Sequence, residues 1–211
     1  MADYDSTIWS YLLTKIGNEY GVAGLMGNLY AESALQPNNL QNSYEDSLGY
    51  TDESYTAAVD SGAYTESQFV NDSAGYGLAQ WTYSSRKQAM YNMYQSGGYS
   101  SIGSIELALD YLWYELENSY SGVLSVLKSA SSIREASDKV LHDFENPADQ
   151  SESVEIKRCS YGETYYNELS GTVTPSDPDT PSTSTTTKRK GFNFVLFNHR
   201  RRMYQWTNRR F

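Results

Sequence analysis

The architecture of this chain depends on the stretch Gly21-Val-Ala-Gly-Leu-Met-Gly-Asn-Leu-Tyr-Ala-Glu32-Ser33, which is apolar and rich in small residues. Its apolar side chains recur at three- and four-residue spacing, and this period predicts a helix. Glu32 stands at the end of that helix, beside leucine and methionine side chains. Partial loss of water disfavours a carboxylate, so we expect Glu32 to keep a proton near neutral pH. A general acid needs this property.

The same helical period recurs elsewhere in the body of the chain. We expect a first helix over Ile8–Ile16 that is stopped near Gly21, because glycine ends helices readily. An apolar stripe over Ile105–Leu116 predicts another helix, and a last one is expected from about Ser151 towards Leu169. The string Ser132-Ile-Arg-Glu135 has the spacing of a capping box, which predicts a helix start. The chain therefore reads as mainly helical.

Residues 35–64 break this pattern. Pro37, Gly49 and Gly62 punctuate the segment and apolar residues are sparse. We expect a long surface loop with a small hairpin, which would form one wall of a groove beside Glu32.

A second informative string is Gly75-Tyr-Gly-Leu-Ala-Gln-Trp81. Its glycines allow the backbone to approach a ligand closely. Tyr76, Gln80 and Trp81 offer ring faces and an amide group suited to sugar rings. Burial of Trp81 in the core is the alternative interpretation.

Composition excludes several classes of site. The single cysteine, Cys159, rules out an internal disulfide, and no Cys/His cluster has the spacing of metal ligands, so no metal or organic cofactor is expected. The N-terminal residues lack the pattern of a signal peptide, and no apolar stretch has membrane-spanning length. We therefore expect a protein that leaves its cell by lysis or within a virus particle.

The motifs carry a family resemblance. Ala31-Glu32-Ser33 with the later Gly77-Leu78-Ala79-Gln80 resembles the catalytic glutamate and the Gly-Leu-x-Gln element of goose-type lysozymes and soluble lytic transglycosylases. The longer string from Ile8 to about Tyr166 is more similar to the phage tail lysozyme family. It includes the segments Asp72-Ser-Ala-Gly-Tyr-Gly-Leu-Ala-Gln-Trp81 and Phe144-Glu-Asn-Pro-Ala-Asp-Gln150.

This resemblance implies a lysozyme-like helical domain that cleaves the β-1,4 bond between N-acetylmuramic acid and N-acetylglucosamine in bacterial peptidoglycan. Glu32 would be the general acid, and Asp72 is the candidate to hold a water, with Glu45, Asp46 and Asp52 as competitors. Residues expected to bind the substrate are Ser33, Tyr76, Gly77, Gln80, Trp81 and Glu145. The alternatives are a lytic transglycosylase that leaves 1,6-anhydro ends and a non-catalytic wall-binding module of a phage tail tip. A peptidase using Cys159 and His142 is a further alternative.

The charge distribution divides the chain into three parts. Residues 1–170 hold 24 of the 26 acidic residues and are expected to form the catalytic domain. Residues 171–187 are rich in Ser, Thr, Pro and Asp and predict a linker. Residues 188–211 contain eight Lys and Arg, no acid and many aromatic residues.

We expect this basic tail to bind an anionic wall polymer or a membrane surface, with docking onto the acidic body or tethering to tail components as alternatives. Nucleic acid is not an expected partner, because the body would repel phosphate. The protein is expected to be a monomer.

Overall fold

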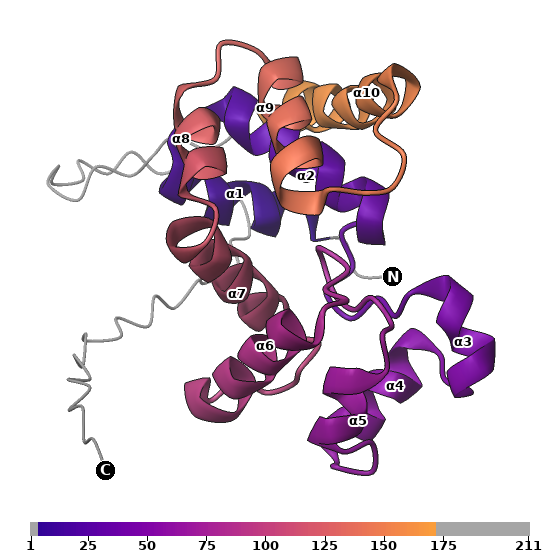
Figure 1. The fold of residues 1–211 in the computed structure, drawn as a ribbon. Helices are drawn as coiled ribbons and strands as arrows, with labels where there is room; N and C mark the ends of the chain where they lie inside the picture. The colour runs from indigo at the N-terminus through magenta and orange to yellow at the C-terminus, as the bar shows by residue number, and fades with distance from the viewer. Residues whose placement is uncertain (1–3, 172–211) are drawn as a thin grey trace, which may run out of the picture. The chain divides into compact units, whose positions relative to one another are not determined.

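The computed structural model describes residues 4–171 of the protein (Figure 1). The basic tail and all but the first residue of the predicted linker lie outside these described residues. None of the described helices is both long and apolar enough to cross a bilayer.

The first two helices are α1 (Asp5–Ile16) and α2 (Glu19–Ser33). α1 ends at Gly17, which has a left-handed backbone (φ 72°), and Asn18 caps α2 by accepting a hydrogen bond from the N–H of Tyr20. The expected break near Gly21 is therefore wrong. Gly21 lies inside α2 because this helix runs close to its neighbour, and a Cβ at this position would lie 1.9 Å from the carbonyl oxygen of Leu127.

α2 is the central helix of a group that includes four other helices. It packs against α1, α8 (Ser121–Ser129), α9 (Ile133–Val140) and α10 (Glu152–Leu169), which surround it in Figure 1. Residues 21–29 of α2 are all buried, so the helix lacks a polar face over this length. Its small residues allow this close packing.

The predicted helices over Ile105–Leu116 and from Ser151 towards Leu169 are confirmed as α7 (Ile105–Asn118) and α10. Ser132 caps α9 as expected, whereas the Glu135 side chain bonds to Ser131 instead of completing the capping box. α9 continues into a single wide π-helical turn, η1 (Leu141–Glu145).

The segment expected to be a loop with a hairpin contains helices. These are α3 (Asn42–Leu48) and α4 (Asp52–Asp60), which are followed by α5 (Glu66–Asn71) and lie together in Figure 1. Gly49 ends α3 in the left-handed conformation, and Thr51 starts α4 with a complete capping box. Within residues 4–171 only isolated antiparallel bridges occur, at Leu40–Tyr76 and Tyr76–Trp81. The mainly helical class is confirmed.

A buried ion pair joins α5 to α6 (Ser84–Gly97). The Nζ of Lys87 lies 2.5 Å from Oδ1 of Asp72, and the two side chains are 0% and 3% exposed. Tyr55 and Tyr64 donate to the other carboxylate oxygen. Lys87 also lies over the ring of Phe69. These contacts hold α4, α5 and α6 together.

Candidate active site

Glu32 lies in the last turn of α2 and forms an ion pair with Arg158 of α10. Nη2 of Arg158 is 2.6 Å from Oε1 of Glu32, and the side chains are 10% and 20% exposed. Glu32 thus faces a guanidinium, whereas the sequence predicts only apolar neighbours.

Asn28 holds Arg158 in place. Its Oδ1 accepts a hydrogen bond of 3.2 Å from Nη1 of Arg158, and its amide nitrogen donates to the carbonyl oxygens of Gly24 and Ser137. Asn28 is fully buried. Because Ser137 belongs to α9, these bonds tie α2, α9 and α10 together behind the Glu32 carboxylate.

Glu145 is the second carboxyl group of the site and ends η1. Burial raises the pKa of the Glu145 carboxyl well above its usual range, and the nearby charge of Glu32 raises it further, while Arg86 and Arg158 act in the opposite direction. Its Oε1 is buried without a hydrogen-bond partner. Burial and the charge of Glu32 thus favour the protonated form of Glu145.

Arg86 of α6 also lies close enough to Glu145 to lower its pKa, and it is fixed by Glu115 of α7. Two bonds of 2.7 Å join its guanidinium to the two carboxylate oxygens. Trp81 Nε1 and the Tyr111 hydroxyl also donate to Glu115. The Arg86 guanidinium lies 5.1 Å from the ring centroid of Phe144. The region around Glu145 therefore contains two guanidinium groups and three carboxyl groups, which belong to Arg86, Arg158, Glu32, Glu115 and Glu145.

Ser33 and Gly77 fix the turn at Gly77–Gln80, which contacts the end of α2. The Ser33 hydroxyl is 2.9 Å from the carbonyl oxygen of Leu78 and is buried. Gly77 has a φ of 77°, and a Cβ there would lie 2.9 Å from the ring of Trp81, so only glycine fits. Gln80 is half-buried and donates to the side-chain and backbone oxygens of Asn39. The amide of Gln80 thus fixes the loop after α2.

Three predicted site residues lie in the core. Tyr76 and Trp81 are fully buried, and the Tyr76 hydroxyl is 2.6 Å from that of Thr56. Asp72 is bound by Lys87 and two tyrosines and has no open face for a water or a sugar. The structure thus argues against the predicted role of Asp72. Its competitor Asp52 accepts from the backbone N–H of Leu40.

The pair needed by a thiol peptidase is not assembled. His142 contacts Gln150 and Glu155 through its two ring nitrogens. Cys159 is buried, its nearest polar partner is Glu163, and desolvation raises the pKa of its thiol. Within residues 4–171, no group of three or more His, Cys, Asp or Glu side chains is placed to hold a metal ion.

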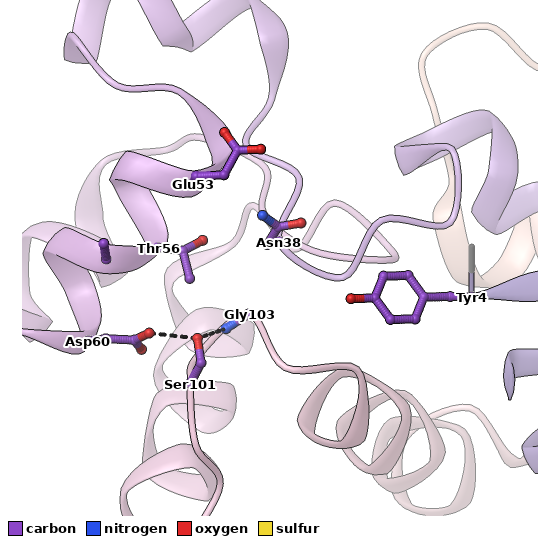
Figure 2. A pocket seen from close by; sticks show the side chains of 8 residues that line it. Tyr4, Asn38, Glu53, Thr56, Asp60, Ser101 and Gly103 are labelled. Atoms are coloured by element: carbon purple, nitrogen blue, oxygen red, sulfur yellow. Dashed lines mark hydrogen bonds between the residues drawn. The ribbon is translucent and has the colours of Figure 1, made fainter. Parts of the chain in front are cut away.

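A hollow of about 320 Å³ lies elsewhere, between Tyr4, α4 and the loop before α7 (Figure 2). Glu53, Thr56 and Asp60 enter it from α4. Asp60 is engaged by the Ser101 hydroxyl at 2.6 Å. No predicted site residue lines this hollow.

The family model described as phage tail lysozyme matches residues 4–169. The chain belongs to the phage tail lysozyme family. A search of curated proteins finds no match. Family membership indicates a lysozyme-like enzyme that acts on peptidoglycan.

The sequence predicts Glu32 and Glu145 as site residues but gives no indication of the groups that surround them, namely Arg158, Arg86 and Asn28. Asn28 stands alone among apolar residues of α2, and a lone amide in such a run is a usable signal for a buried polar network. Arg86 and Arg158 carried no comparable signal, because their partners are distant in the sequence.

Proposed function

We propose that this protein cleaves the β-1,4 bond between N-acetylmuramic acid and N-acetylglucosamine, with Glu32 as the general acid. The observation that carries the proposal is that Glu32, at the end of α2, and Glu145, at the end of η1, lie near enough to interact electrostatically with each other and with Arg158, which is ion-paired with Glu32. Such a site combines a carboxyl group whose raised pKa favours a bound proton with a carboxyl group that is ion-paired to an arginine. Glycoside cleavage requires both, because the leaving oxygen must be protonated while positive charge develops on the sugar ring.

The reaction divides into two steps. Glu32 protonates the bridging oxygen as the bond from C1 breaks, and the resulting carboxylate then faces the oxocarbenium-like sugar. A water that attacks C1 gives a reducing N-acetylmuramic acid end. Attack by the 6-hydroxyl of the same sugar gives a 1,6-anhydro end, so the product distinguishes a muramidase from a lytic transglycosylase. We propose hydrolysis.

The test is mass spectrometry of the muropeptides released from purified peptidoglycan. Wild-type protein is compared with Glu32→Gln and with Glu106→Gln, which removes an exposed glutamate of α7. We expect reducing N-acetylmuramic acid ends from wild type and Glu106→Gln and none from Glu32→Gln. Anhydro ends would identify a transglycosylase, reducing N-acetylglucosamine ends a glucosaminidase, and absence of any wild-type product a non-catalytic wall-binding module.

We also propose that the protein acts as a monomer and reaches the wall in a phage particle or at host lysis. Its basic tail, outside the described residues, would bind anionic wall polymer by charge attraction. The test is binding of wild type and an Arg200→Gln, Arg201→Gln, Arg202→Gln variant to walls with and without teichoic acid. Equal binding in all four cases would contradict this role of the tail.

A further inference from the structure

Glu145 occupies an unusual backbone position. The N–H of Asn146 bonds to the carbonyl oxygen of Leu141 at 2.8 Å and closes the wide turn of η1, and Asn146 itself is left-handed, with a φ of 46°. π-helical turns of this kind occur frequently at functional sites, and a left-handed non-glycine residue persists only where its surroundings hold it. Phe144 anchors the turn in the core.

The charges around Glu145 do not balance when every group is ionised. The groups that face it are Glu32 of α2, Arg86 of α6, Glu115 of α7 and Arg158 of α10. Arg86 is already paired with Glu115, and Arg158 is already paired with Glu32. Glu145 is therefore a third carboxyl group beside two guanidinium groups. One proton within this partly buried site removes the excess negative charge at the least cost, because an unpaired buried charge is unfavourable.

The proton has a preferred location. Glu32 is already ion-paired with Arg158, whereas Oε1 of Glu145 is buried and has no hydrogen-bond partner. We propose that Glu145 is the proton reservoir of the active site: it stores the catalytic proton at rest, passes it to Glu32 during the reaction and recovers it afterwards. The proposal rests on the proposed function and assigns Glu145 a positioning role that acts through Glu32.

The proton balance of the cycle is complete. An O–H bond of Glu145 breaks as an O–H bond of Glu32 forms, and the combined charge of the two groups is unchanged. Glu32 then gives the proton to the bridging oxygen, which keeps the electron pair of the broken bond and leaves as a hydroxyl. Water forms the new bond to C1 and loses a proton to Glu32, from which it returns to Glu145. One water is consumed.

The first experiment measures the pH dependence of kcat for Glu145→Gln, which keeps the size and polarity of the side chain but cannot ionise. We expect kcat to fall at least about 10-fold, because positioned proton transfer is commonly worth about 10²–10⁴-fold. The alkaline limb of the profile should move to lower pH, since the remaining proton would sit on Glu32 beside Arg158 and without an acidic neighbour. Glu106→Gln is the control for loss of an exposed acid and should keep the wild-type profile.

An infrared spectrum at neutral pH reports the stored proton without any activity. We expect the carbonyl band of a protonated carboxylic acid in wild type and its absence in Glu145→Gln; in Glu32→Gln the band should disappear at a lower pH than in wild type, because the charge of Glu32 raises the pKa of Glu145. A wild-type kcat and pH profile in Glu145→Gln would overturn the proposal, and so would a wild-type spectrum without the band. If Glu145→Gln does not fold, the shift of the band's disappearance to lower pH in Glu32→Gln tests the proposal, and an unchanged pH dependence would overturn it. Failure of the proposed function is recognised separately, by the absence of cleavage products from wild type.

Discussion

Gly27 of α2 and Gly162 of α10 are in backbone contact: a Cβ on Gly27 would lie 2.6 Å from the amide nitrogen of Gly162 and 2.4 Å from the carbonyl oxygen of Arg158. This contact places the Arg158 side chain beside Glu32, because both helices must approach closely for the ion pair to form at 2.6 Å. The ion pair between Glu32 and Arg158 in the candidate site therefore depends on glycine at position 27.

Substituting Gly27 with alanine should force α10 away from α2. We expect a loss of about 1–3 kcal/mol in the free energy of unfolding, as for overpacked cores, together with reduced activity. Gly122→Ala is the matched control, because its Cβ would meet nothing within 4 Å in α8, and it should stabilise the protein by about 0.5–1 kcal/mol. Urea denaturation measures both values. Equal stability of the two variants would contradict the close contact.

Arg158→Gln should move the pH profile in the direction opposite to Glu145→Gln. Arg158 lowers the pKa of Glu145, so removal of its positive charge should make the site hold its proton more tightly. We expect the alkaline limb of kcat to shift to higher pH, with a lower kcat because Glu32 loses its partner. The pH profile of kcat measures the effect, and a shift to lower pH would contradict the charge arrangement.

The buried pair of Lys87 and Asp72 predicts a large effect on stability. Lys87→Met leaves the Asp72 carboxylate buried and unpaired, so we expect a loss of about 3–5 kcal/mol. Lys139→Met is the control, because it breaks a partly exposed pair with Asp143 in one helical stretch, and such pairs are worth about 0–1 kcal/mol. Chemical denaturation checks both. A loss below about 1 kcal/mol for Lys87→Met would show that the pair is not desolvated.

Tyr76→Phe tests whether this tyrosine binds substrate. The Tyr76 hydroxyl is buried against Thr56, so its removal should cost about 0.5–1.5 kcal/mol of stability and leave KM unchanged. Tyr83→Phe, at a residue that is 73% exposed, should change neither quantity. A raised KM in Tyr76→Phe without loss of stability would favour the role in sugar binding that the sequence suggested.

His142 should make stability depend on pH. Hydrogen bonds to Gln150 and then Glu155 raise the pKa of His142 above its usual 6.5. The protonated ring therefore stabilises the fold fully below pH 6.5, and this contribution is lost as pH rises through the higher folded pKa. We expect the Tm difference between wild type and His142→Gln to shrink from pH 5.5 to pH 8. This range is wide enough because about one pH unit on either side of a pKa covers most of the titration. A constant difference would show that the charge of His142 does not matter.

The sequence predicts the long helices because each carries its own apolar period. α1, α7 and α10 are of this kind. α3 and α4 were missed because short helices contain too few turns to show a period, and they are specified by their ends, such as the capping box at Thr51 and the left-handed Gly49. Turn residues were interpreted as a loop where they mark helix boundaries.

The candidate site divides in the same way. Local motifs were sufficient to identify the family, the helical class, and Glu32 and Glu145 as residues of interest. They could not show that Asp72 pairs with Lys87, or that Trp81 turns into the core to reach Glu115, because these contacts form only when separate helices pack. The protonation of the site is likewise a property of the folded chain. Coulomb attraction and desolvation depend on distances in space, and α2, η1, α6 and α10 bring together charges that lie far apart in the sequence.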